Sequence, residues 1–176
     1  MEAYAGGDVS AFERLYARHR GPLYRYFLRQ AGDAATANDL YQGSWEKIIR
    51  ARVKYTASAP FKAWMYRIAR NHLVDHFRRS RPTAVLEPES IASDTAGPER
   101  IMMGNQAAAG LALAVQRLPP EQKEALLLKL ESGLDLQSIA EVTGVNPETA
   151  KSRLRYALDK VRTSLANADK EPGAGP

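Results

Sequence analysis

The stretch that decides the fold is LDLQSIAEVTGVNPETAKSRLRYALDKVR, residues 134–162. Apolar residues recur at helical spacing up to Val142, Gly144 interrupts them, and a second helical pattern begins at Asn146-Pro147. Asn is a favoured residue at the position that caps a helix N-terminus, and Pro fits the first helical position. The stretch therefore predicts two helices joined by a tight turn.

The second of these helices has a polar face suited to reading DNA. Its apolar residues recur every three or four positions and predict one buried stripe of Ala150, Leu154, Ala157, Leu158 and Val161. The outward side then carries Glu148, Lys151, Ser152 and Arg155, with Arg153 alongside. A supported helix with short polar and basic groups near its N-terminus suits the major groove. A surface helical hairpin with a solvated basic face would show the same pattern.

The composition limits the chemistry that the chain can perform. The 176 residues carry a net charge of +5, which favours an anionic partner, and include no cysteine, which excludes disulfides and thiolate chemistry. His72 and His76 lack the acidic residue of a zinc-protease helix, so we expect neither a metal site nor a cofactor. With no signal peptide or membrane span in the pattern, we expect a cytoplasmic chain without membrane insertion.

Charge is distributed very unevenly along the chain. Residues 47–81 hold ten Lys and Arg against one acid, Asp75, whereas residues 82–99 hold four acids and no Lys or Arg. The second segment is also rich in Pro and lacks helical periodicity, so it predicts a flexible acidic linker. We therefore expect two small domains, residues 1–81 and 100–166, with a disordered tail at 167–176.

Helical periodicity and the absence of strand-type alternation predict an all-α fold. In the first domain the expected helices are residues 9–20, 22–31, 34–51 with Asp33 as the cap, and 61–80. In the second domain they are residues 101–117 and 120–131, followed by the helix-turn-helix.

The helix at residues 61–80 carries two distinct stripes. One is expected to face the interior and consists of Phe61, Trp64, Met65, Ile68 and His72. The other is basic and polar and consists of Arg67, Asn71, Val74 and Arg78, flanked by Arg70. Like charges on one face destabilise a helix slightly, so this second stripe favours a phosphate partner. The preceding loop adds Tyr55, Thr56 and Phe61, the kind of groups that hold unpaired bases beside cations.

These segments resemble a known family, the bacterial RNA polymerase sigma factors of the extracytoplasmic-function class. The resemblance rests on AFERLYARHRGPLYRY, ANDLYQGSW and FKAWMYRIARNHLVDHFRR in the first half. In the second half it rests on LPPEQKEALLLKLESGLDLQSIAEVTGVNPETAKSRLRYALDKVR. It implies a transcription initiation factor that binds the clamp helices and flap of core RNA polymerase and directs it to promoter DNA.

The resemblance also implies a role for each segment. Polymerase binding would involve Asp39, Leu40, Gln42 and Trp45. Recognition and melting of the minus-ten element would involve Tyr55, Thr56, Phe61, Arg67, Arg70, Asn71 and Arg78. Recognition of the minus-thirty-five element would involve Glu148, Lys151, Ser152, Arg153 and Arg155. An anti-sigma factor or a regulatory kinase would be a further partner.

The sequence departs from the family pattern at two places. Asn38 and Gly43 stand where relatives commonly carry a carboxylate, so we expect a weak grip on polymerase, or one that needs added charge such as phosphorylation of Thr56. Tyr156 and Leu158 stand where many relatives carry Arg, which predicts reduced phosphate contact late in the second helix.

Other classes of protein explain the sequence less well. A dimeric helix-turn-helix regulator of duplex DNA would account for residues 134–162 but not for the basic first half. A nuclease or recombinase would need clustered carboxylates, and Asp75 is the only acid in the basic region. We therefore expect a protein that is not an enzyme.

Overall fold

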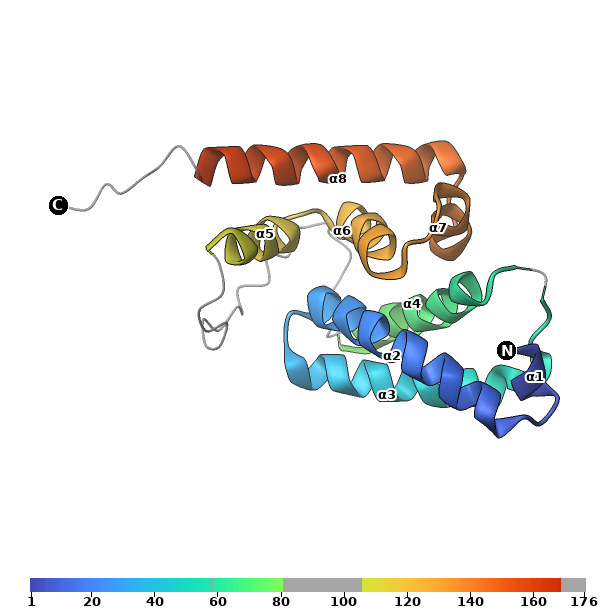
Figure 1. Ribbon diagram of the computed structural model, residues 1–176. Coiled ribbons are helices and arrows are strands. Elements are labelled where there is room, and N and C mark those ends of the chain that lie inside the picture. Colours follow the sequence, from blue (N-terminus) through green and yellow to red (C-terminus); the bar gives the residue numbers. More distant parts are fainter. Residues whose placement is uncertain (58, 81–105, 169–176) are drawn as a thin grey trace. The chain divides into compact units, whose positions relative to one another are not determined.

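The computed structural model describes residues 1–57, 59–80 and 106–168 (Figure 1). These residues form helices, turns and short loops with no strand among them, which confirms the all-α prediction. The chain divides into two compact units, Met1–Gly97 and Pro98–Pro176, and each unit is described by itself. The predicted linker at residues 82–99 lies outside the described residues.

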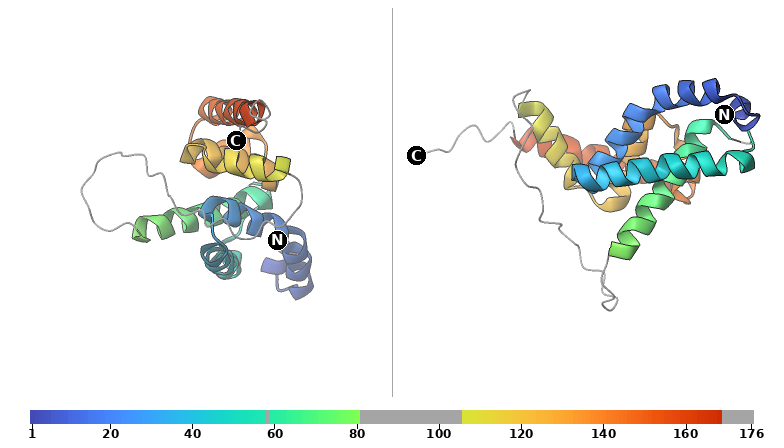
Figure 2. Two further views of the ribbon diagram at one scale, coloured as in Figure 1. Left: turned by 90° about the vertical axis from the view of Figure 1, so that its left-hand side faces the viewer. Right: turned by 90° about the horizontal axis from the view of Figure 1, so that it is seen from below.

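The first unit is built on three long helices. They are α2 (Val9–Ala31), α3 (Ala34–Ala51) and α4 (Phe61–Ser80), preceded by the short α1 (Glu2–Ala5). A 3-10 turn, η1 (Arg52–Lys54), follows α3. Helix α3 packs against both α2 and α4, as the views in Figure 2 show. The side chains that fill the core include Leu23, Phe27, Leu40, Ile48 and Met65.

Helix α2 corrects one prediction. Residues 9–20 and 22–31 were expected to form two helices, but α2 continues through Pro22. Proline removes one backbone hydrogen bond and crowds the preceding turn, which normally ends a helix. Here His19, Leu23 and Phe27 are buried on both sides of the proline, so the packing of one continuous apolar face offsets the local cost.

The predicted cap of α3 is confirmed. The Asp33 carboxylate accepts a hydrogen bond of 2.8 Å from the backbone N–H of Thr36. This bond satisfies one of the donors that a helix N-terminus leaves unpaired, and it lowers the pKa of Asp33.

The second unit surrounds one long helix. Helix α8 (Pro147–Ala168) packs against α5 (Gln106–Gln116), α6 (Pro120–Leu127) and α7 (Leu136–Thr143). A π-helical turn, η2 (Leu128–Ser132), continues α6. Helix α8 runs to Ala168, so residues 167 and 168 of the predicted tail are helical, and residues 169–176 lie outside the described part.

The helix-turn-helix prediction is confirmed in its local chemistry. Gly144 ends α7 with φ of +71°, a left-handed conformation that glycine adopts without strain. The Asn146 side-chain oxygen then accepts a hydrogen bond of 2.7 Å from the backbone N–H of Thr149, with Pro147 as the first helical residue. The turn thus has a cap on each side, as the sequence predicts.

Candidate nucleic-acid interface

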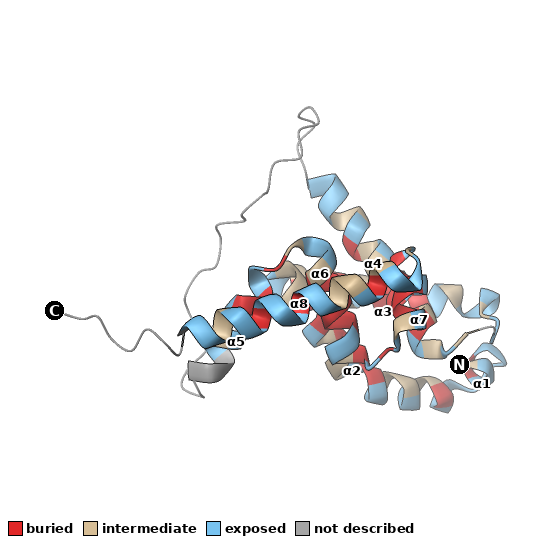
Figure 3. Cartoon of the chain, turned by 90° about the horizontal axis from the view of Figure 1, so that it is seen from above, coloured by how far each residue is buried: buried red, intermediate tan, exposed pale blue. Residues whose placement is uncertain are grey.

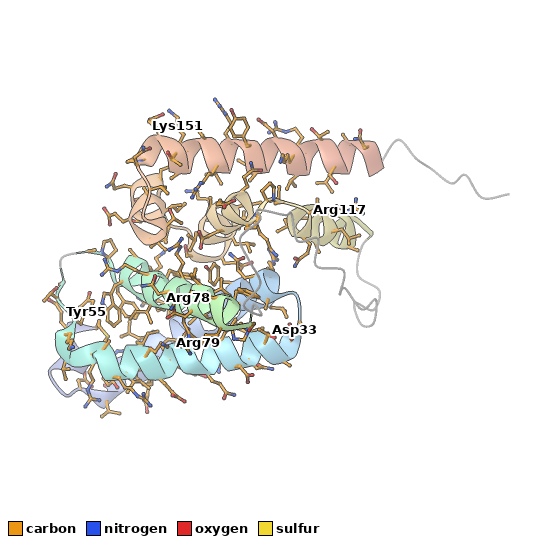
Figure 4. All side chains as sticks on the ribbon, turned by 180° about the vertical axis from the view of Figure 1, so that it is seen from behind. Asp33, Tyr55, Arg78, Arg79, Arg117 and Lys151 are labelled. Atoms are coloured by element: carbon orange, nitrogen blue, oxygen red, sulfur yellow. The ribbon has the colours of Figure 1, made fainter. Side chains whose placement is uncertain are left out.

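The outer face of α4 carries the basic and polar stripe. Arg67, Asn71, Val74 and Arg78 are all exposed, and Arg70 is half-buried. Asp75 lies 3.3 Å from Arg78 in an exposed ion pair, which reduces the charge that Arg78 presents. Figure 4 labels Arg78 with its neighbour Arg79, which is also exposed near the end of the helix. The stripe therefore offers cations and one amide to an anionic partner.

The inward face of α4 differs from the predicted one. The fully buried residues are Ala63, Met65, Tyr66, Ala69 and Leu73, whereas Phe61, Trp64, Ile68 and His72 are only half-buried. The buried face is rotated by roughly a third of a turn from the expected stripe. Ala63 and Ala69 lie outside the predicted stripe but are buried, because small residues let neighbouring helices approach closely.

The displaced face leaves an aromatic cluster beside the basic stripe. The Tyr55 ring meets Trp64 edge-on at 5.1 Å between centroids, and Phe61 lies 5.9 Å from Trp64. Phe61 also contacts the His19 ring of α2 at 5.4 Å. Trp64 was expected to be interior. Because residues three apart lie on neighbouring parts of a helix surface, its spacing from Phe61 is the signal that could have placed both rings in this cluster. All three cluster rings are half-buried, so each retains an accessible edge or face.

Tyr55, labelled in Figure 4, lies between the η1 turn and α4 and is followed by Thr56. The backbone N–H of Tyr55 donates to the carbonyl of Arg52 at 3.2 Å, so the loop starts from the η1 turn. Burial and the negative charge of Glu2 raise the pKa of Tyr55 above its ordinary value. The phenol therefore stays neutral near pH 7 and can approach a nucleic acid without adding negative charge. Thr56 is exposed.

His72 of α4 lies directly against Gly43 of α3. A Cβ atom at Gly43 would lie only 2.5 Å from Nε2 of His72, so the missing side chain makes room for the imidazole. Burial lowers the pKa of His72, and the charges of Lys47 and His76 add to this effect. His72 is thus a neutral packing residue. Within the described ranges no three metal-binding side chains come together.

The four residues of the polymerase-binding prediction divide into two groups. Asp39 and Gln42 are exposed on α3, whereas Leu40 and Trp45 are only 1% and 5% exposed. The Trp45 ring lies 5.0 Å from Tyr16 and 5.9 Å from Phe12 of α2. Leu40 and Trp45 therefore hold α3 against its neighbours, and Asp39 and Gln42 face outward.

Helix α8 presents its polar groups near its N-terminus. Glu148 and Lys151 are exposed and form an ion pair of 3.7 Å, and Arg155 is exposed one turn further along. Figure 3 shows exposed residues in pale blue along α8 beside buried ones in red. Ser152 and Arg153 are half-buried. Lys151, labelled in Figure 4, stands near the start of the helix. These groups match the hydrogen-bonding needs of base edges and phosphates in a major groove.

The buried stripe of α8 is narrower than predicted. Ala150, Ala157 and Val161 are buried, and Leu154 is half-buried. Leu158 was expected inside but is 45% exposed, because its position in the helix turns it toward the edge of the stripe. The Tyr156 ring is 50% exposed, and the Arg155 guanidinium lies 5.0 Å from its centroid. The side chains of Tyr156 and Leu158 thus face outward.

Comparison with known proteins identifies the family. The model "Sigma-70 region 2" matches residues 15–83, and the model "Sigma-70, region 4" matches residues 109–161. The chain is 34% identical over 173 residues to the ECF RNA polymerase sigma factor BldN of Streptomyces coelicolor, covering 96% of this chain and 65% of BldN. It is 30% identical to the RNA polymerase sigma-H factor of Pseudomonas aeruginosa, covering 94% of this chain and 93% of that protein.

Solved structures share the fold. The sigma factor RpoE, crystallised with the anti-sigma factor NepR from Bartonella quintana, has a TM-score of 0.72 and 21% identity over 90% of this chain and 98% of that chain. CnrH, in complex with the cytosolic domain of CnrY, has a TM-score of 0.66 and 24% identity over 94% of this chain and 93% of that chain. These two likenesses concern the fold alone.

The chain belongs to the extracytoplasmic-function class of bacterial RNA polymerase sigma factors. It is a transcription initiation factor that binds core RNA polymerase and directs it to promoters, and the dimeric regulator is not favoured. Sigma factors are generally not enzymes. No helix in the described part combines the length and apolar character needed to cross a membrane.

Proposed function

We propose that the first unit opens the minus-ten element with the outer face of α4 and the aromatic loop before it. The observation that carries this proposal is the exposed stripe of Arg67, Asn71 and Arg78 beside the half-buried cluster of Tyr55, Phe61 and Trp64. Aromatic rings bind unstacked bases, and adjacent cations neutralise the strand that carries them. Thr56 and Arg70 flank this surface and complete it.

Asn71→Ala tests this role. We expect Asn71→Ala to reduce permanganate reactivity of the minus-ten strand while upstream DNA binding is retained, because the amide acts only on the opened strand. Asn38→Ala is the matched control, since it removes an exposed amide from α3 of the same unit. Both are measured at saturating core polymerase. Normal opening by Asn71→Ala would refute its role.

We propose that α8 reads the minus-thirty-five element through Lys151 and Arg155, with Glu148, Ser152 and Arg153 in support. Each good base contact contributes about 1–3 kcal/mol of discrimination. Lys151→Ala and Arg155→Ala should therefore weaken dependence on the minus-thirty-five sequence. Lys160→Ala removes an equal charge from another side of α8 and should leave sequence dependence unchanged. Equal loss in all three variants would indicate only general attraction to DNA.

We propose that Asp39 and Gln42 contact the polymerase clamp helices directly, and that Leu40 and Trp45 keep α3 in place. Asp39→Ala should lower the affinity for core polymerase without changing the stability of the unit. Leu40→Ala should destabilise the unit by about 2–5 kcal/mol, because it removes a buried side chain. Unchanged stability of Leu40→Ala would contradict this division.

Control of this factor is proposed to come from a separate protein. The fold neighbours RpoE and CnrH were each solved with a partner, the anti-sigma factor NepR in one case. An anti-sigma factor is therefore the first partner to seek. A kinase acting on exposed Thr56 is the alternative. Co-purification from cells, followed by mass spectrometry for a bound protein and for phosphate on Thr56, distinguishes the two. We propose a cytoplasmic location for the chain.

A further inference from the structure

Helix α1 is the one helix of the first unit that lies ahead of the residues matched by the region 2 model, which begin at residue 15. It spans only Glu2–Ala5, yet it contacts both α2 and the η1 turn. Tyr4 is 6% exposed, whereas its neighbours on α1 are exposed. One side chain therefore fixes this helix to the rest of the unit.

Tyr4 joins α2 to the η1 turn. Its ring lies 4.9 Å from the Phe12 ring of α2. Its hydroxyl accepts a hydrogen bond of 3.1 Å from Nη1 of Arg52, the first residue of η1. The guanidinium carbon of Arg52 also lies 5.2 Å from the centroid of the Tyr4 ring, within range of a cation–π attraction. Both the ring and the hydroxyl of Tyr4 thus hold Arg52.

Arg52 connects this contact to the aromatic loop. Its backbone N–H donates to Ile49 at the end of α3, and its carbonyl accepts the hydrogen bond from Tyr55. The side chain is therefore held by α1 while the backbone sets the start of the loop. Burial raises the pKa of Tyr55, and the negative charge of Glu2 on α1 adds to this effect.

We propose that Tyr4 is a positioning residue for minus-ten recognition, acting through Arg52 on the loop that begins at Tyr55. We call this series of contacts, from Tyr4 through Arg52 to Tyr55, the N-terminal clamp; it is unrelated to the clamp of the polymerase. It rests on the function proposed above for the loop and α4. Arg52, one of the ten cations of residues 47–81, has a structural role in this proposal, because its guanidinium donates a hydrogen bond to the Tyr4 hydroxyl.

The turn after α1 brings Tyr4 into contact with Arg52. Gly7 has φ of +104°, a conformation that side chains disfavour, and the next backbone N–H, that of Asp8, donates to the carbonyl of Ala3 at 2.9 Å. The chain is thereby folded back so that Tyr4 reaches Arg52. A side chain at Gly7 would strain this turn, which gives a way to loosen the clamp without altering Tyr4.

The test measures open-complex formation by the full chain with core polymerase on two templates. One template has an intact minus-ten element. The other has abasic sites in the minus-ten strand whose bases the aromatic loop is proposed to bind. Loss of a single hydrogen bond predicts that Tyr4→Phe slows opening of the intact template by about 2- to 10-fold. Gly7→Ala and Arg52→Ala should do the same, and none of the three should slow opening of the abasic template further.

Two comparisons make the result decisive. Arg50→Ala removes an equal charge from an exposed position two residues away and should not affect the intact template selectively. Unchanged opening by Tyr4→Phe and Gly7→Ala, or an equal loss on both templates, overturns the clamp. If Asn71→Ala slows opening and these variants do not, the clamp alone is refuted. If Asn71→Ala and Tyr55→Ala both open DNA normally, the function proposed for this surface fails as well.

Discussion

Replacing Gly43 by alanine should destabilise the first unit, although alanine is ordinarily the better helix former. The added Cβ would lie 2.5 Å from Nε2 and 3.2 Å from Cε1 of His72, so the imidazole must move. Overpacking of this kind costs about 1–3 kcal/mol. Alanine in place of glycine within a helix returns about 1 kcal/mol. The expected net loss is about 1 kcal/mol.

The sign should reverse when His72 is removed. In a His72→Ala background the added methyl group no longer meets the imidazole, so Gly43→Ala should stabilise the unit by about 1 kcal/mol. The chain has two tryptophans, Trp45 and Trp64, and both lie in the first unit. Tryptophan fluorescence during urea unfolding therefore reports this unit alone, and 1 kcal/mol should shift its midpoint by about 1 M or less.

A double-mutant cycle gives the result that would refute this reasoning. If Gly43→Ala changes stability equally with and without His72, the two side chains do not compete for space, and the close approach of α3 and α4 at this point is wrong. The contact between Gly43 and His72 also limits how the missing carboxylates at positions 38 and 43 of α3 can be tested. Gly43→Glu would disturb His72 as well as add charge, so Asn38→Glu alone is the clean substitution.

Three further predictions follow from the structure. Asn38→Glu, at an exposed site of α3, should tighten binding to core polymerase by up to about 1 kcal/mol, and unchanged affinity in a titration would contradict a charge deficit. Asn146→Ala should destabilise the second unit by about 0.5–2 kcal/mol in thermal unfolding followed by circular dichroism, and Asn146→Ser should restore it. Burial lowers the pKa of His19 and His72, so below about pH 6.5 the unfolded chain binds protons that the folded chain does not. Stability should therefore fall as pH decreases from 7.5 to 5.5, and replacing both histidines by glutamine should flatten the dependence.

Local signals predicted the helix boundaries well. The Asp33 and Asn146 caps and the start of α4 at Phe61 depend on residues close in the sequence, and the structure has them where expected. Pro22 was misread because a local rule competed with packing along a whole helix, which sequence spacing does not display. Helix α1 was not predicted because four residues show no periodicity, and one of the two side chains that Tyr4 contacts, Arg52, is distant in the sequence.

Facing directions were harder to predict than boundaries. On α4 the large rings were assigned to the interior, but the helix buries Ala63 and Ala69 and leaves Trp64 half-exposed. Residue size alone favours burial of tryptophan, whereas close approach of two helices favours small residues. The Tyr55 ring contacts Trp64 and so gives it a packing partner outside the core. That partner comes from a loop, whose path the helical pattern cannot give.

The two surfaces of the first unit share a structural origin. Helix α3 carries Asp39 and Gln42 outward near its beginning, and its last turn passes directly into the η1 turn at Arg52. The loop that begins at Tyr55 is therefore an extension of the helix proposed to bind polymerase. Because Tyr4 holds the junction between them, the position of the aromatic loop is fixed relative to α3 before DNA arrives. A preorganised loop loses less conformational entropy when it captures a base, which explains why a four-residue helix outside the matched region would matter for promoter opening.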